Sequence, residues 1–177
     1  MSNFRNSNEH QSISRIGKFM IFGMWIGLLA LLSLFFYNWQ QKEFNPNQSI
    51  QSKTNRQGQT ELVLHANRQG QYIASGYINN VAVVFLVDTG ANDVSIPLHI
   101  ANKIGLERGR QIRFETANGI AYGFQTKLNS VKVGEIELSN IRASINPNVK
   151  FDEILLGMSF LKHLELIQKD KTLTLRY

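Results

Sequence analysis

The sequence predicts an all-β domain, a small closed β-barrel with one or two short helices, preceded by an N-terminal transmembrane helix. Three observations lead to this prediction. An uncharged apolar run lies near the N-terminus, short segments of alternating polarity follow one another from residue 60 onward, and Gly or Asn separates many of them. Many short strands with frequent turn signals are typical of all-β barrels and sandwiches.

The first element is the apolar run at residues 19–37, which is 19 residues long and carries no charge. At about 1.5 Å per residue, a helix of this length spans roughly 28 Å, close to the hydrocarbon thickness of a bilayer. Tyr37 and Trp39 lie at its C-terminal end, where aromatic rings favour the membrane interface. The run is therefore predicted to span a membrane.

A cleaved signal peptide is the alternative interpretation of this run. Signal-peptide cores are usually shorter, about 7–15 residues, and end at a small-residue cleavage site. Residues 38–42 contain no such site, which favours an uncleaved anchor. Arg5, Arg15 and Lys18 precede the run and only Lys42 follows it closely, so the positive-inside rule predicts a cytoplasmic N-terminus. We expect a single-pass inner (plasma) membrane protein with a periplasmic or otherwise extracytoplasmic domain.

The charge distribution argues against nucleic acid as a partner. The net charge is +6, but residues 1–57 hold six basic and two acidic residues, whereas residues 58–177 hold thirteen and eleven. Most of the excess therefore lies outside the predicted domain, where it suits membrane topology and anionic headgroups. The absence of cysteine excludes disulfides and thiolate metal sites.

Composition divides the chain into four predicted parts. Residues 1–18 form a cytoplasmic polar tail, residues 19–37 the transmembrane helix, residues 38–59 a flexible linker rich in Gln, Asn and Ser, and residues 60–177 the folded domain.

The predicted domain consists of short strands separated by turn residues. Period-two alternation and turn signals place strands at residues 61–66, 71–78, 81–87, 94–97, 111–116, 121–128, 131–138 (two short strands around a Gly turn), 141–145, 154–157 and 173–175. Two short helices are expected, one at residues 98–104 that ends at Gly105 and one around residues 160–164.

The most informative segment is the apolar strand at residues 83–87, which leads directly into Asp88. An isolated carboxylate at the end of a core strand needs a partner. Two carboxylates that share one proton can activate water for attack on an amide, because one takes a proton while the other donates one. The chain encodes one candidate of this kind, so we expect a second copy to supply the other about a two-fold axis. Thr89 and Gly90 suit the tight turn that such an acid requires.

Three segments resemble the retropepsin-like aspartic proteases, especially their bacterial membrane-anchored branch. The segments are residues 85–91, 116–119 and 154–161, in the family's order and separated by about 30 and 40 residues. The resemblance covers residues 60–177 and implies a retropepsin-type barrel that hydrolyses protein or peptide substrates as a homodimer, without a cofactor or a metal.

The resemblance also implies roles for individual residues. Asp88 matches the catalytic acid, and its active-site support is Thr89, Gly90 and Ala91. The substrate-covering flap corresponds to Asn118, Gly119 and Ile120, and the loop beneath the catalytic turn corresponds to Leu155, Leu156 and Gly157.

The chain departs from the viral members of this family at two positions. Viral enzymes usually pair an Asp, two residues after the motif's Gly, with an Arg that follows the Gly of the third segment. Asn92 and Met158 stand at these positions, so the pair is absent without leaving an unpaired charge. Asp93 could contact substrate or be a solvated turn acid.

Other interpretations of the same residues remain open. Asp88 could cap a turn, and Asn118 with Gly119 could form a plain hairpin turn. The whole domain could be a catalytically silent module for dimerisation or peptide binding. The four histidines show no metal-ligand spacing, and a G-x-x-x-G pattern at residues 23–27 is compatible with close helix contact.

Overall fold

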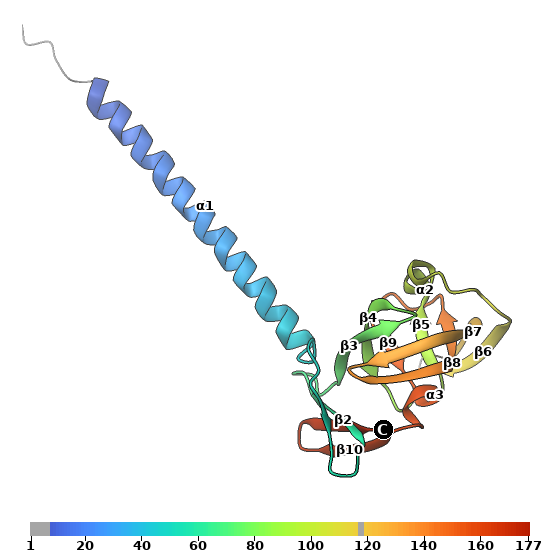
Figure 1. The fold of residues 1–177 in the computed structure, drawn as a ribbon. Helices are drawn as coiled ribbons and strands as arrows, with labels where there is room; N and C mark the ends of the chain where they lie inside the picture. The colour runs from blue at the N-terminus through green and yellow to red at the C-terminus, as the bar shows by residue number, and fades with distance from the viewer. Residues whose placement is uncertain (1–7, 117–118) are drawn as a thin grey trace, which may run out of the picture. The chain divides into compact units, whose positions relative to one another are not determined.

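The computed structural model describes residues 8–116 and 119–177. It separates into two compact units, Met1–Gln41 and Lys42–Tyr177. The first unit is helical, and the second holds all of the β-strands (Figure 1). The predicted class, mostly β with few helices after an N-terminal apolar helix, is confirmed.

Helix α1 (Asn8–Phe44) is longer than the predicted membrane segment. It begins within the predicted polar tail and continues seven residues beyond residue 37, because the flanking Glu, Gln and Lys residues are good helix formers. Within residues Gly17–Phe44 of this helix, an 18-residue window has a mean hydropathy of 2.3, so one described helix is long and apolar enough to cross a membrane.

The segment predicted as a flexible linker, residues 38–59, is partly built into the β unit. Asn45 and Asn47 are buried, and the Asn47 carboxamide bonds the backbone of two different strands. Its Nδ2 donates to the carbonyl oxygens of His65 at 2.9 Å and Ile73 at 2.7 Å, and its Oδ1 accepts from the His65 amide at 2.7 Å. A side-chain amide offers the same donor and acceptor as a peptide group, which explains how this polar segment packs against strand ends.

The first sheet has four antiparallel strands in the order β1-β2-β11-β10. These are β1 (Ser52–Thr54), β2 (Thr60–His65), β11 (Thr172–Arg176) and β10 (Glu165–Lys169). One face carries the fully buried Leu62, Leu64 and Leu175, and the other face is exposed and carries Val63 and Ile167 among polar residues. Period-two alternation predicts β2 and β11, but β1 and β10 were not predicted because neither alternates strongly.

The second sheet has seven strands in the order β3-β4-β9-β5-β8-β7-β6. They are β3 (Ile73–Ile78), β4 (Val81–Val87), β5 (Val94–Pro97), β6 (Gln111–Thr116), β7 (Gly119–Val133), β8 (Ile136–Asn146) and β9 (Ile154–Leu156). Strand β3 also pairs with β7, so the pairings run in a circuit that leaves β6 outside. This circuit favours the predicted closed barrel, and closure itself stays a prediction.

Local signals explain most of the turns and both short helices. Asn79 and Asn80 have φ angles of 48° and 67°, which suit the tight hairpin between β3 and β4. Helix α2 (Leu98–Ile104) ends at Gly105 in the left-handed conformation, as predicted. Helix α3 (Met158–Leu161) begins two residues earlier than expected, directly after Gly157.

One cluster of buried apolar residues contains members from both sheets and from α2 and α3. Phe85 of β4 and Phe160 of α3 are its largest fully buried side chains. Burial of this apolar surface is the main stabilising contribution, and it determines which face of β4 and β9 points inward. Asp88 lies where these two strands end.

Candidate active site

Strand β4 ends immediately before Asp88, which is half-buried, while Thr89 and Gly90 are exposed. The Gly90 amide donates a hydrogen bond of 2.9 Å to Oδ1 of Asp88. A Cβ atom at residue 90 would lie 3.2 Å from the same oxygen, so glycine leaves this carboxylate room. The Ala91 amide closes the turn by donating to the Asp88 carbonyl oxygen at 3.3 Å. The turn therefore fixes one carboxylate oxygen and presents the side chain at the strand's end.

Strand β9 supports this turn along its backbone. It pairs in parallel with β4, with Val87 opposite Leu156, and the Asp88 amide donates to the Leu156 carbonyl oxygen at 3.2 Å. Leu155 faces Leu86 in the same pair and also pairs with Ser95 of β5. The structure thus brings the third sequence segment directly against the predicted catalytic turn.

Gly157 is required by close approach of the backbone. A Cβ atom there would lie 2.2 Å from the Asp93 carbonyl oxygen and 2.6 Å from that of Ala91. Beyond it, the Met158 amide donates to Ala91 at 2.8 Å and the Ser159 amide donates to Asn92 at 2.9 Å. These backbone bonds join the start of α3 to residues 91–92, directly after the Asp88 turn.

Ser159 is a supporting residue that sequence reasoning did not single out. It is buried, and its Oγ accepts from the Val94 amide at 3.0 Å and donates to the Arg142 carbonyl oxygen at 2.7 Å. One hydroxyl therefore connects α3, β5 and β8. In the sequence, Ser159 stands out only as a small polar residue within an apolar segment. That pattern does not reveal which backbone groups the hydroxyl bonds.

Asp93 is neither free nor fully solvated. Its Oδ1 accepts a hydrogen bond of 2.6 Å from Nε of Arg142, and its side chain is 19% exposed. The Arg142 side chain is 61% exposed, so solvent screens this ion pair. Asp93 therefore has a protein partner of its own, and Asp88 is the carboxylate that the turn presents.

The predicted flap corresponds to the hairpin of β6 and β7, in which Thr116 pairs with Gly119. Asn118 lies outside the described residues. Gly119 has a φ of 104°, which favours glycine, and the Ile120 side chain is 56% exposed. The hairpin is present at the predicted place, and its role toward substrate stays a prediction.

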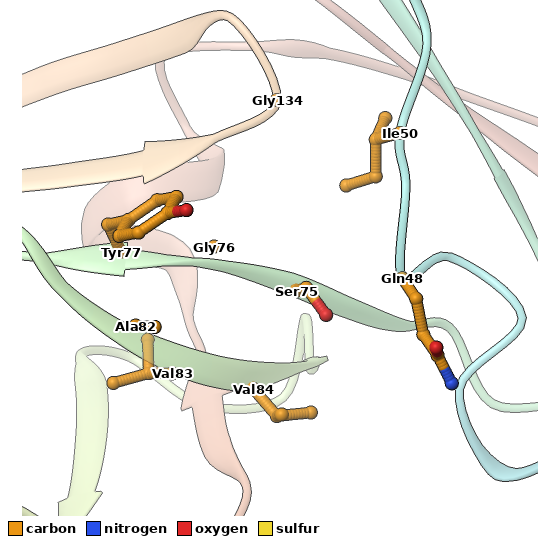
Figure 2. A pocket seen from close by; sticks show the side chains of 9 residues that line it. All are labelled: Gln48, Ile50, Ser75, Gly76, Tyr77, Ala82, Val83, Val84 and Gly134. Atoms are coloured by element: carbon orange, nitrogen blue, oxygen red, sulfur yellow. The ribbon is translucent and has the colours of Figure 1, made fainter. Parts of the chain in front are cut away.

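A pocket of about 370 Å³ lies away from these residues (Figure 2). Figure 2 shows Gln48 and Ile50 on the segment before β1, opposite side chains from β3 and β4. None of its lining residues is a predicted site residue, and none carries a carboxylate. They are Gln48, Ile50, Ser75, Gly76, Tyr77, Ala82, Val83, Val84 and Gly134.

The turn, its glycines and the supporting strand together present one acid at the end of a core strand. This arrangement fits the class of aspartic proteases. The family described as "gag-polyprotein putative aspartyl protease" matches residues 74–163, which include β4, the Asp88 turn, the β6–β7 hairpin and α3. The chain belongs to the retropepsin-like aspartic protease family.

Individual proteins are also similar to this chain. A crystal structure of a retropepsin-like aspartic protease from Rickettsia conorii is 30% identical, with a TM-score of 0.58, and covers 73% of this chain and 96% of that one. Two curated but uncharacterised proteins are each 32% identical, one from a Sinorhizobium species over 152 residues and one from Rickettsia prowazekii over 116. These alignments cover 80% and 64% of this chain, and the chain spans 65% and 49% of the two relatives' own length.

Proposed function

We propose that this chain is a membrane-anchored aspartic endopeptidase that hydrolyses peptide bonds as a homodimer. The observation that carries the proposal is the presentation of Asp88 by a turn bonded to β9 and α3, in a member of an aspartic protease family. One chain presents one such carboxylate, and Asp93 is engaged by Arg142. A second copy of Asp88 would complete the dyad about a two-fold axis.

The proposed chemistry follows from two carboxylates that share one proton. The ionised Asp88 takes a proton from a water molecule, and the protonated Asp88 of the partner donates to the carbonyl oxygen of the scissile bond. The hydrogen bond from Gly90 holds one oxygen in place, so the other can face the water. Thr89 and Ala91 would support the turn, and Leu155, Leu156 and Gly157 would hold it from beneath. Both carboxylates return to their starting protonation after amine release, so no cofactor is needed.

Two further features complete the proposed enzyme. Asn118, Gly119 and Ile120 would form the tip of a flap over an extended protein or peptide substrate, for which the exposed Ile120 offers apolar contact. The circuit of strands through β3 and β7 supports a closed barrel as the scaffold.

The apolar helix supports a membrane anchor for this enzyme. We assign residues 1–18 to the cytoplasm, residues 19–37 to the membrane, and residues 60–177 to the protease domain on the periplasmic or extracytoplasmic side, with residues 38–59 between them. Because the chain has no cysteine, single substitutions Ser7→Cys and Asn148→Cys report this topology. In intact cells, a membrane-impermeant maleimide should label only Asn148→Cys. Labelling of only Ser7→Cys would show that the orientation is the opposite of the proposed one.

The test of catalysis compares the full-length wild type with Asp88→Asn in proteoliposomes. With denatured protein as substrate at mildly acidic pH, we expect Asp88→Asn to lower the hydrolysis rate at least about a hundredfold. Asp152→Asn is the matched control, since this acid is 83% exposed and bonds only His99 among the described residues. Equal hydrolysis by wild type and Asp88→Asn would refute the catalytic role, and no hydrolysis by the wild type would favour a silent binding module.

Mixing the two forms tests the shared dyad. If each active site needs Asp88 from both chains, an equal mixture of freely exchanging wild type and Asp88→Asn retains about a quarter of the activity, because only that share of dimers holds two acids. If each chain were active by itself, the mixture would instead retain about half of the activity.

A further inference from the structure

The last turn of α1 is bonded to the β unit and belongs to it from Lys42 onward. The Phe44 carbonyl oxygen accepts a hydrogen bond of 3.4 Å from Nδ2 of Asn67, and Glu43 forms an ion pair with Arg68. Because the Arg68 side chain is 70% exposed, solvent screens this ion pair. The firmer attachment follows directly after Phe44.

That attachment is a strap, residues 45–47, which lies along the start of β3. Nδ2 of Asn45 donates to Oγ of Ser75 at 3.0 Å, and its Oδ1 accepts from the Asn47 amide at 2.9 Å. Asn47 forms a parallel bridge with Ala74, and its carbonyl oxygen accepts from the Ser75 amide at 3.2 Å. Both asparagines are buried, so releasing the strap would leave buried polar groups without partners. The strap is therefore a fixed part of the β unit.

The strap lies two strand spacings from the strand that leads to Asp88. Asn47 bridges to Ala74 of β3, and Ala74 pairs with Phe85 of β4. Neighbouring strands are about 4.8 Å apart and each residue advances about 3.3 Å, so Asn47 and Asp88, three residues beyond Phe85, are separated by roughly 14 Å. The chain therefore enters the β unit close to the turn that presents the acid.

Only a short piece of chain connects the proposed membrane segment to the strap. The backbone is helical through Phe44, so the part of α1 beyond residue 37 covers about 10 Å. From Phe44 to Asn47 the chain spans at most about 11 Å. With the roughly 14 Å inside the β unit, Asp88 lies at most about 35 Å from the end of the membrane segment, whatever the direction of α1. A fully flexible linker over residues 38–59 would instead extend to about 75 Å before the domain begins.

We infer that the strap restricts this enzyme to juxtamembrane substrates, which are extended segments of proteins anchored in the same membrane. An extended chain advances about 3.4 Å per residue, so a height of 35 Å corresponds to about ten residues beyond the bilayer. A segment anchored at this height meets the acid at a high effective concentration, and a segment held further out does not. The inference rests on the proposed function. It goes further by naming the substrate class and the structural feature that selects it.

Energy transfer measures the height of the acid turn without relying on activity. The full-length chain contains no cysteine, so Asn92→Cys carries a single fluorescent donor close to Asp88, in proteoliposomes with acceptor-labelled lipid. A helical (EAAAK) spacer of about 60 residues, inserted between Gln41 and Lys42, adds up to about 90 Å and should lower the transfer at least about fivefold.

The same spacer appended after Tyr177 is the matched control and should leave the transfer unchanged. Transfer that is equally weak with and without the insert would overturn the short tether.

Two model substrates that differ only in height then test the selection. Each is a transmembrane helix that carries one cleavage sequence, identified from the products of denatured-protein hydrolysis, either next to the membrane or beyond a helical spacer of about 60 residues. In proteoliposomes, the wild type should cut the near site at least about tenfold faster than the distant site. The enzyme with the insert after Gln41 should prefer the distant site, and in detergent micelles the wild type should cut both sites at equal rates. Equal rates in proteoliposomes, or a preference that the insert leaves unchanged, would overturn the inference.

The results separate this inference from the proposed catalysis. Strong energy transfer in a chain that hydrolyses nothing would support the short tether and refute the protease, and the substrate class with it. Hydrolysis that depends on Asp88 and proceeds equally at near and distant sites would support the protease and refute the restriction to juxtamembrane segments.

Discussion

The hydroxyl of Ser159 donates a hydrogen bond of 2.7 Å to the carbonyl oxygen of Arg142, across 17 residues of sequence. Oγ of Ser159 also accepts from the Val94 amide at 3.0 Å, while the Ser159 amide donates to the Asn92 carbonyl oxygen. One buried side chain on α3 thereby connects β5, which follows the Asp88 turn, to β8. The position of that turn depends on this small polar network as well as on apolar packing.

Ser159→Ala should therefore destabilise the β unit. It leaves the Val94 amide and the Arg142 carbonyl oxygen without their partner, which costs about 1–3 kcal/mol in the free energy of unfolding. Urea titration of the full-length protein, followed by far-UV circular dichroism, measures this. Ser139→Ala, at an exposed residue of β8, is the control and should change the free energy by less than about 0.5 kcal/mol. Equal effects of the two substitutions would contradict the role given to Ser159.

Gly157→Ala should have a larger effect, because the added methyl group meets backbone and not flexible side chains. It would lie 2.2 Å from one carbonyl oxygen and 2.6 Å from another, so the turn must move. We expect a loss of about 2–4 kcal/mol in unfolding free energy and loss of hydrolysis. Gly17→Ala is the control, since a Cβ there meets nothing within 4 Å. A Gly157→Ala protein as stable and active as the wild type would show that the turn tolerates displacement.

Asn47→Ala should show that the β unit begins well before residue 60. The substitution removes three hydrogen bonds to the backbone of His65 and Ile73 and leaves one buried and two partly buried backbone groups without this partner, at a cost of about 2–4 kcal/mol. The exposed Asn148 provides the control substitution, Asn148→Ala. If a fragment starting at residue 60 unfolds at the same urea concentration as one starting at residue 43, the buried asparagines contribute nothing to stability.

Lowering the pH should remove the stability that the ionised Glu61 carboxylate contributes. Hydrogen bonds from Asn55 and then Arg176 lower the pKa of Glu61 below its ordinary value of 4.5. A carboxyl whose pKa is lower in the folded state stabilises that state above the unfolded pKa, and this contribution is lost as the pH falls through the folded pKa. The difference in stability between wild type and Glu61→Gln should therefore be present at pH 7 and shrink below about pH 4.5. A difference that is constant with pH would contradict this.

Sequence reasoning could predict the candidate site because its residues are local. Asp88, Thr89 and Gly90 are consecutive, and the apolar residues before them predict the strand that carries them. Gly157 was expected beneath the turn from resemblance, and the structure supplies the physical reason, a backbone approach that excludes any Cβ. The Asp93–Arg142 and Ser159–Arg142 contacts were missed, because their partners lie 49 and 17 residues apart and nothing in a single sequence links them.

The sequence by itself determined the β class, the apolar helix, the turn glycines and asparagines, and the position of the single presented acid, because periodicity and backbone conformation are local properties. Only the tertiary structure decided that residues 45–47 belong to the β unit, that β9 lies beside β4, and that β10 forms a sheet edge. Those outcomes depend on pairing between distant segments, where the free energy comes from burial and hydrogen bonds that no local pattern encodes.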